Sequence, residues 1–230
     1  ILFFIIINLL SKQLLLKLTN IFILILIQGS IGWYMVKSGL IENTSVSHYR
    51  LSIHLFIAFT IFSSLIWILL NSLKMTKKKF FQFNYNYFSV KLLLILLFLQ
   101  IILGAFVSGL DAGKIYQTWP LMNGNYFPDD VELNSFFNFD KASTVQFFHR
   151  NIAYLIFIVS VYLGFNVFKK KETHLYNNYL FFILFINVQI VLGIFVLISG
   201  ANIYLASMHQ ISSIFLVLIA LSLYHRTISM

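Results

Sequence analysis

Long apolar runs recur along the whole chain, and they constrain its fold more than any other feature. A run of about 20 residues is long enough to cross a hydrocarbon layer of about 30 Å as an α-helix. Such runs fall at 20–36, 51–71, 90–109, 146–168, 178–199 and 203–223, after an incomplete one at 1–10. Backbone polar groups must be paired within lipid, and no run alternates like a barrel strand. We therefore predict an all-α, polytopic membrane helix bundle.

The composition narrows the possible chemistry. Of the 230 residues, 60% are hydrophobic and only 10% are charged, which excludes an ordinary soluble domain and a disordered chain. The chain has no cysteine, so disulfides, iron–sulfur clusters, thiolate zinc sites and cysteine nucleophiles are excluded. Because the chain begins with Ile1 inside an apolar run, we interpret it as a fragment whose N-terminal part is missing.

The charges of the loops alternate in sign and predict the orientation. The basic side holds Lys12, Lys17, Lys74, Lys77, Lys78, Lys79, Lys91, Lys169, Lys170, Lys171 and Arg226. The other side holds six of the seven acids: Glu42, Asp111, Asp129, Asp130, Glu132 and Asp140. Basic loops face the cytoplasm or the mitochondrial matrix, so the acidic side is the outer side. The net charge of +9 therefore indicates membrane lipid as a partner and argues against nucleic acid.

An internal duplication links two of the apolar runs. QGSIGWYMVKSG at 28–39 and QIVLGIFVLISG at 189–200 carry Gly, Ser and Gly at offsets of +4, +10 and +11 from the glutamine. A third run shares Gln100 and Gly104. Small residues at this spacing let helices approach closely, and a buried glutamine can hydrogen-bond between them. A short outer loop and a helix with a histidine follow each of the first two copies.

The duplication predicts two pseudo-symmetric four-helix halves. If the copies correspond, the run that contains His149 matches the incomplete run at 1–10, and a partner histidine is expected before Ile1. We assign 1–72 to the remainder of the N-terminal half, 73–89 to an inner basic linker and 90–230 to the complete C-terminal half.

Three histidines are candidates for a functional site. His54, His149 and His209 each lie in the first two turns of a helix that starts on the outer side, so we expect them at similar depth. Ionisable groups within a bilayer are costly and are functional candidates by default. Contact with solvent or the membrane interface is expected for the other three histidines, His48, His174 and His225.

Heme iron is the group that best suits these histidines. Zinc needs more ligands, and a proton relay needs acids within the membrane, whereas the apolar runs contain no acid. Two neutral imidazoles from facing helices suit the two axial positions of a heme iron. Heme propionates would then lie at the outer edge, where Arg150, Arg50 and Lys37 can pair with them.

At these residues the chain resembles heme A synthase, an assembly enzyme for cytochrome oxidase in bacterial and mitochondrial inner membranes. The matching stretches are GWYMVKSGL at 32–40, SVSHYRLSIHL at 45–55, GAFVSGLDAGKIYQTWPLMNG at 104–124, FFHRNIAYL at 147–155 and MHQ at 208–210. The absence of cysteine is similar to the alphaproteobacterial and mitochondrial branch of the family. The resemblance implies eight helices in two halves, with one heme site in each half.

The resemblance also implies roles for individual residues. His149 and His209 would be the axial ligands of a cofactor heme b, with Arg150 beside it. His54 would ligate the iron of the substrate heme O in the N-terminal site, near Arg50. The glutamate thought to be catalytic would precede Ile1, so the catalytic residue lies outside this chain and the fragment alone is expected to be inactive.

The implied reaction is the oxidation of the C8 methyl group of heme O to a formyl group, which makes heme A for cytochrome c oxidase. The protein would thus be an oxidoreductase of a bacterial or mitochondrial inner membrane. Its expected partners are heme O, heme O synthase and an electron donor or acceptor, and a homo-oligomer is left open.

The sequence disfavours other functions. The prenyltransferase that acts one step earlier would need aspartate-rich motifs on its inner loops, and those loops contain no Asp. A bis-histidine membrane cytochrome that only transfers electrons would not need the long outer loop at 111–145 with its WPLMNG stretch, which is either a plain surface loop or a lid. A transporter is disfavoured because the two halves have the same orientation and no broken helix carries a buried charge.

Overall fold

The structure is a computed structural model, and it describes residues 11–39, 46–81, 88–132 and 136–228. Its long helices are α2 (Lys12–Gly39), α3 (His48–Leu73), α4 (Phe88–Gly109), α5 (Ala142–Lys169), α6 (Thr173–Ile198) and α7 (Ile203–Thr227), and a short 3-10 helix η2 (Ala112–Lys114) follows α4. All six long helices are apolar enough to cross a membrane. The prediction of an all-α polytopic bundle is confirmed, whereas the apolar run at 1–10 lies outside the described residues.

The helices are longer than the apolar runs from which they were predicted. Lys17, which precedes the run at 20–36, lies in the second turn of α2, and Lys91 lies in the first turn of α4. A lysine can bury its methylene stem along a helix while its ammonium group reaches the membrane interface. A helix can therefore extend beyond the strictly apolar run.

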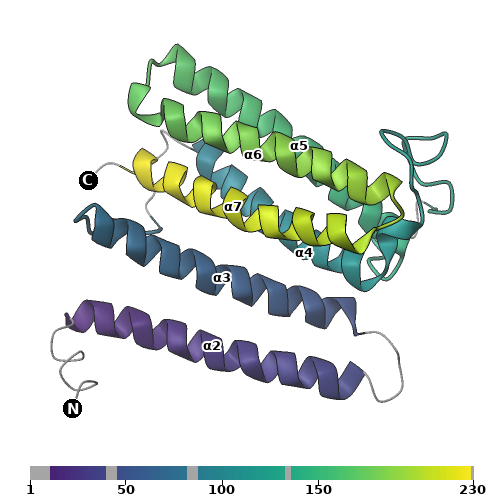
Figure 1. Cartoon of the computed structure of the whole chain (residues 1–230), viewed down its shortest axis with the longest axis horizontal. Helices are drawn as coiled ribbons and strands as arrows, with labels where there is room; N and C mark the ends of the chain where they lie inside the picture. The colour runs from purple at the N-terminus through teal and green to yellow at the C-terminus, as the bar shows by residue number, and fades with distance from the viewer. Residues whose placement is uncertain (1–10, 40–45, 82–87, 133–135, 229–230) are drawn as a thin grey trace.

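Four of the helices form a bundle. Helix α4 packs against α5 and α7, and α6 packs against the same two helices, so that α5 and α7 face each other diagonally. Helix α3 lies against α4 and α7, and α2 packs mainly against α3 as an outer layer (Figure 1). The bundle α4–α7 corresponds to the C-terminal half predicted from the duplication.

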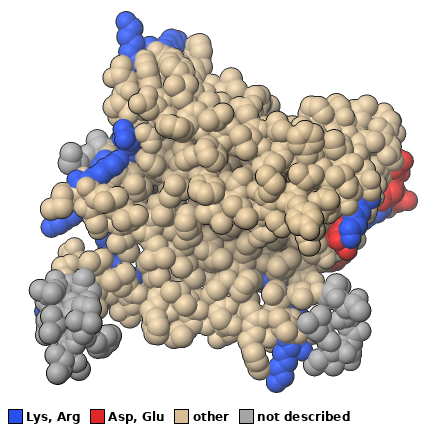
Figure 2. All heavy atoms as spheres, in the orientation of Figure 1, with Lys and Arg blue, Asp and Glu red and all other residues tan. Residues whose placement is uncertain are grey.

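The two ends of the molecule differ in charge. The Asp and Glu side chains visible in Figure 2 gather at the end where α4 leads into the long loop, and most Lys and Arg side chains lie at the opposite end. Lys37, in the last turn of α2, is one of the cations at the acidic end. This distribution agrees with the alternation of charge along the chain, and we call the acidic end the outer end.

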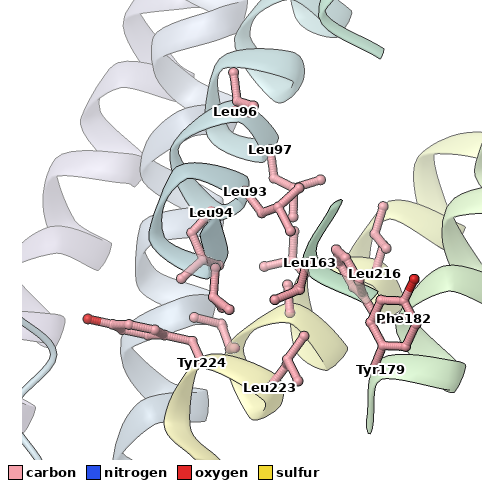
Figure 3. Close-up of a cluster of buried hydrophobic side chains, with 14 of the residues drawn as sticks. Leu93, Leu94, Leu96, Leu97, Leu163, Tyr179, Phe182, Leu216, Leu223 and Tyr224 are labelled. Atoms are coloured by element: carbon pink, nitrogen blue, oxygen red, sulfur yellow. The ribbon is translucent and has the colours of Figure 1, made fainter. Parts of the chain in front are cut away.

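The tightly packed core lies toward the inner end of the bundle. Figure 3 shows Leu93 and Leu97 of α4 meeting Leu163 of α5, Phe182 of α6 and Leu223 of α7. In contrast, no residue between 187 and 215 is fully buried, although this stretch includes the outer halves of α6 and α7. At the outer end of the bundle, full burial is confined to α4, α5 and the loop that follows α4, whereas the outer halves of α6 and α7 are only partly buried.

The α6–α7 connection is a short turn at the outer end. Gly200 has φ +67°, a left-handed conformation that glycine adopts without strain. Two residues later, the side-chain oxygen of Asn202 accepts hydrogen bonds from the backbone N–H groups of Tyr204 and Leu205 and caps the first turn of α7. This turn sets the start of α7 and hence the depth of His209.

A polar network ties the segment after α3 to the end of α7. The Oδ1 atom of Asn71 accepts from the backbone N–H of Lys78 at 3.0 Å and lies 3.3 Å from Nε2 of His225. The ammonium group of Lys78 donates to the carbonyl of His225 at 3.0 Å. His225 is fully buried, so its predicted contact with solvent was wrong, because the segment after α3 folds over the end of α7. His174 is exposed, as predicted.

Candidate functional site

Three helix pairs carry the same arrangement of residues near the outer end. In each pair, the first helix has a glutamine and, four residues later, a glycine, and the next long helix has a histidine that packs on that glycine. We call this arrangement the Gln–Gly–His unit. Its three copies are Gln28–Gly32–His54 on α2 and α3, Gln100–Gly104–His149 on α4 and α5, and Gln189–Gly193–His209 on α6 and α7.

The glycine of each unit makes room for an imidazole ring. A Cβ atom on Gly32 would lie 3.0 Å from Cε1 of His54, and one on Gly193 would lie 3.0 Å from Cε1 of His209. At Gly104 the corresponding distance to His149 is 3.4 Å. Carbon atoms rarely approach within 3.0–3.4 Å, so any larger residue would displace the ring. The sequence pattern predicted close helix packing, but it did not reveal that a histidine is what approaches each glycine.

Replacing Gly193 by alanine tests this packing, with Gly29→Ala as the matched control. No atom lies within 4 Å of a Cβ added at Gly29, so that substitution only raises helix propensity. We expect Gly193→Ala to be about 1–3 kcal/mol less stable than Gly29→Ala, because the added methyl group overpacks against His209. Reversible unfolding in mixed detergent micelles measures the difference. Equal stability of Gly193→Ala and Gly29→Ala would contradict the close packing of His209 on Gly193.

The glutamines contact the histidines in two of the units. The amide nitrogen of Gln100 donates to the backbone carbonyl of His149 at 3.0 Å and lies 3.2 Å from its Nε2. Gln189 makes the same two contacts with His209, at 3.0 Å and 3.3 Å. The Nδ1 atoms of His54, His149 and His209 are buried and have no hydrogen-bond partner among the described residues. Each ring therefore has a buried nitrogen that no protein group in this part of the chain satisfies.

His149 and His209 belong to the same bundle, whereas His54 does not. His149 lies in the second turn of α5 and His209 in the second turn of α7, on the two helices that face each other diagonally. His54 lies on α3 and packs on α2, outside the α4–α7 bundle. Their proposed ligand roles stay predictions.

The two arginines next to these histidines have different surroundings. Arg150 donates from Nη2 to the carbonyl of Tyr116 at 2.9 Å, and from Nη1 to the carbonyls of Thr118 at 2.9 Å and Leu121 at 3.3 Å. Arg50 stacks on the ring of Tyr34, 4.9 Å from its centroid. Arg150 thus holds the outer loop, a contact that the sequence did not indicate. Its predicted pairing with a heme propionate stays a prediction.

The long outer loop is folded onto the end of the bundle. Tyr116 and Met122 are 3% and 1% exposed, and they pack with Phe147 of α5 in a small apolar cluster. Gln146 donates to the carbonyl of Tyr116 at 3.0 Å, directly beside the contact of Arg150. Of the two predicted alternatives, a plain surface loop or a lid, this ordered packing favours a loop that covers the outer end.

A buried phenol anchors this loop to two carboxylates. The hydroxyl of Tyr116 donates to Asp129 and, at 2.8 Å, to Asp130. Burial, together with these bonds to carboxylates, raises the pKa of Tyr116 far above its ordinary value of 10.0. Burial opposes the ionisation of Asp130, but hydrogen bonds from Ser143 and Tyr116 and the nearby Lys141 lower its pKa overall. At neutral pH the loop therefore pairs a neutral phenol with a charged Asp130.

The raised pKa of Tyr116 predicts that the loop opens in alkali. Its contribution to stability is complete below pH 10.0, the unfolded value, and is lost as the pH rises toward the higher folded value. We expect subtilisin to cut the loop progressively faster above about pH 10. Tyr116→Phe should be cut faster than the wild type at neutral pH, because it lacks the hydrogen bonds to the carboxylates. Its cleavage rate should not rise steeply in alkali. An equal alkaline rise in the wild type and in Tyr116→Phe would contradict the role of Tyr116 in closing the loop.

His48 was expected to contact solvent or the membrane interface, and this expectation was wrong. It is the first residue of α3 and is 9% exposed, with its Nε2 atom 3.3 Å from Oδ1 of Asp140. A Cβ atom at Gly109 would lie 2.7 Å from the Cβ of His48. The absence of a side chain at Gly109 lets the start of α3 approach the end of α4 and buries the histidine there.

Comparison with known sequences assigns the chain to a family. Residues 1–221 match the family described as "Cytochrome oxidase assembly protein". The chain belongs to this family. The match covers all three Gln–Gly–His units and all six long helices except the last turns of α7.

Relatives of the chain from several organisms carry the name Heme A synthase. The one from Pelagibacter ubique is 49% identical over 197 residues, which cover 84% of this chain and 57% of the relative. Those from a Wolbachia of Brugia malayi and from Bartonella quintana are 37% and 38% identical over 90% and 94% of this chain, each with 61% of the relative covered. The chain thus spans about three-fifths of the length of these relatives. The resemblance to the heme A synthase family is confirmed.

The described part of the chain holds six helices long and apolar enough to cross a membrane, and as a member of this family the chain is a multi-pass inner-membrane protein. The histidines could be identified from the sequence, but the residues that contact them were missed. The missed contacts are those of Gln100 with His149 and of Arg150 with the loop. A glutamine four residues before a glycine in all three copies was the signal that could have indicated the first of these.

Proposed function

We propose that the full-length protein that contains this chain is a heme A synthase, which oxidises the C8 methyl group of heme O to a formyl group. The observation that carries the proposal is the recurrence of the Gln–Gly–His unit, twice in the α4–α7 bundle and once on α2 and α3. The shared name of the relatives supports this reaction, and their membership of a cytochrome oxidase assembly family supports heme A as its product.

The α4–α7 bundle fits a heme b as resident cofactor. His149 and His209 each carry an imidazole whose Nδ1 is buried without a partner among the described residues and whose Nε2 contacts a glutamine amide. Residues 187–215 of α6 and α7 are only partly buried by protein, which leaves surface on these helices for a bound group. When bound, the heme supplies one-electron chemistry that no side chain can supply. The residues of the bundle bind and orient it.

The α2–α3 pair fits one side of the substrate site. His54 packs on Gly32 with its Nδ1 buried and unpartnered in the described region, like the histidines of the cofactor site. Arg50 lies one turn before His54, toward the outer end, where a propionate of heme O would need a cation. We propose that His54 ligates the substrate iron and that Arg50 binds a propionate.

The outer loop fits a role in excluding water from the cofactor site. Arg150, the residue that follows His149, donates hydrogen bonds to the loop. Tyr116 and Met122 of the loop are buried against α5. A water-poor site strengthens electrostatic interactions with the bound group and suppresses side reactions. A protein that only relays electrons does not need such a cover, which favours the enzyme over the bis-histidine cytochrome.

Extraction of pigments from cells tests the proposed function. The full-length protein is expressed in cells that make heme O but no heme A, and the extracted hemes are separated by chromatography. We expect heme A to appear with the wild-type protein and to be absent with His54→Ala, while heme b is retained by both. The matched control is His174→Ala, which changes an exposed histidine at the inner end. Heme b in the purified protein together with unconverted heme O would instead favour the electron carrier.

A further inference from the structure

We propose that a groove between the start of α4 and the end of α5 binds an anionic phospholipid of the inner leaflet. Both helix ends lie at the inner end of the molecule, far from the Gln–Gly–His units (Figure 1). In the bound state, an acyl chain lies along the apolar part of the groove, and the phosphate lies beside Lys170. The inference does not depend on the proposed function.

The groove has the size of a ligand site and opens toward the membrane. Its volume of about 570 Å³ falls within the range of about 300–1,000 Å³ that is usual for small-molecule sites. Phe88 and Leu92 of α4 line one side, and Ile158 and Tyr162 of α5 line the other. Phe88, Ile158 and Tyr162 are 65%, 62% and 60% exposed, so the described part of the chain leaves these side chains open to lipid.

The depth of the groove matches one leaflet of a bilayer. On α5 the lining residues begin at Ile158, and they end at Lys170, which follows the last residue of the helix. The helical path between these two residues is about 18 Å long, which is close to half of a hydrocarbon layer of about 30 Å. A helix of a partner protein crosses both leaflets and would need a groove that continues past Ile158. A lipid of the inner leaflet therefore fits this groove better than a partner helix.

The polar residues of the groove gather at its inner end. Ser89 lies in the first turn of α4, and Asn166 lies in the last turn of α5. The side chains of Leu92, Ile158 and Val159 line the part that is closer to the middle of the membrane. The hydroxyl of Ser89 and the amide of Asn166 are donors that suit phosphate oxygens. The groove thus has the same order of polar and apolar groups as a phospholipid.

The charges at the inner end of the groove favour an anionic headgroup. Lys170 lines the groove, and Lys169 and Lys171 are its neighbours in the chain. Glu172 also lines the groove, and its carboxylate lies 3.5 Å from Nδ1 of His174. The lysines outnumber this carboxylate, so the local charge is positive. Basic pockets between spanning helices on the inner side are typical binding sites for anionic lipid headgroups.

Native mass spectrometry of the full-length protein tests the headgroup site. The protein is released from detergent micelles after incubation with phosphatidylglycerol or with the zwitterionic phosphatidylcholine. We expect phosphatidylglycerol to be retained in preference to phosphatidylcholine, and we expect Lys170→Gln to bind it about 5-fold more weakly. Lys77→Gln is the matched control, because Lys77 is an exposed lysine of the same end that does not line the groove. This control should bind phosphatidylglycerol like the wild type.

A second pair of variants tests the apolar part of the groove. Ile158→Trp places a bulky ring in the path of the acyl chain. Leu180→Trp places the same ring on α6, at a position that is 52% exposed and does not line the groove. We expect Ile158→Trp to lose most of the retained phosphatidylglycerol and Leu180→Trp to keep it. The heme content should be the same in both variants.

Two results would overturn the proposal: equal retention of phosphatidylglycerol and phosphatidylcholine, or equal binding by Lys170→Gln and Lys77→Gln. A lipid-free dimer that Ile158→Trp dissociates would also overturn it, because a second copy of the chain would then occupy the groove. Should Ile158→Trp fail to fold, one equivalent of phosphatidylglycerol with a diazirine in its acyl chain decides the matter in the wild type. We expect this lipid to label peptides with Leu92 and Ile158, and even labelling of α5 and α6 would contradict the site. Specific lipid binding by a protein that makes no heme A would uphold this inference and refute only the proposed function.

Discussion

Replacing His149 or His209 by alanine in the full-length protein is expected to abolish its six-coordinate low-spin heme spectrum. The two rings are the candidate axial ligands of the cofactor, and an alanine supplies no nitrogen to the iron. Because loss of an indirect partner already costs about 10–100-fold in metal affinity, we expect the heme retained during purification to fall by at least about 10-fold. Absorbance spectra and pyridine hemochrome assays measure the coordination and the amount of heme.

The inner histidine His225 provides a demanding control for this experiment. It is fully buried like the candidate ligands, but it lies at the opposite end of α7 in the network with Asn71 and Lys78. We expect His225→Ala to lower the stability of the protein while keeping a low-spin spectrum. Normal heme in a protein that carries both His149→Ala and His209→Ala would refute the ligand assignment and, with it, the proposed cofactor site.

The second large effect is expected when Arg150 is changed to leucine. Its guanidinium donates to three loop carbonyls. Its removal takes a charged donor from all three, although the carbonyls of Tyr116 and Leu121 keep hydrogen bonds from Gln146 and Thr118. Hydrogen bonds from charged groups contribute about 1.5–3 kcal/mol each, but partial exposure reduces this, so we expect the loop to be destabilised by about 2 kcal/mol. Tryptic cleavage after Lys114 should then be about 30-fold faster, as measured by mass spectrometry of the products.

The variant Arg150→Lys separates charge from geometry. A lysine keeps the positive charge but has no planar fork of donors, so it cannot reach three carbonyls at once. We expect its cleavage rate to fall between those of the wild type and Arg150→Leu. If all three proteins were cut at the same rate, Arg150 would not hold the loop, and pairing with a propionate would become its main candidate role.

Much of the fold could be predicted because lipid leaves few options for the backbone. Apolar runs predict helices, and the alternation of loop charges predicts their orientation, as the segregated charges of Figure 2 illustrate. Helix ends were less predictable, because residues such as Lys17 and Lys91 are compatible both with an interfacial helix turn and with a loop. The boundaries of the two proposed halves remain predictions.

The candidate site was only partly predictable, since hydrogen bonds between distant segments leave no local pattern. His54, His149 and His209 stood out because ionisable residues are rare in apolar runs. The contact of Gln100 with His149 joins residues 49 positions apart, and that of Arg150 with Tyr116 joins residues 34 apart. The burial of His225 likewise depends on the segment after α3, some 150 residues earlier in the chain. Such pairings emerge only once the helices are packed.

The uneven packing along the α4–α7 bundle has a consequence for the order of assembly. The leucine-rich inner half, shown in Figure 3, interlocks through contacts between protein side chains alone. The inner half of the bundle therefore needs no bound group to pack, because its contacts are made between protein side chains. The proposed heme would then bind to helices whose inner halves are already packed. Its binding would order the outer halves of these helices and leave the packing of the inner halves unchanged.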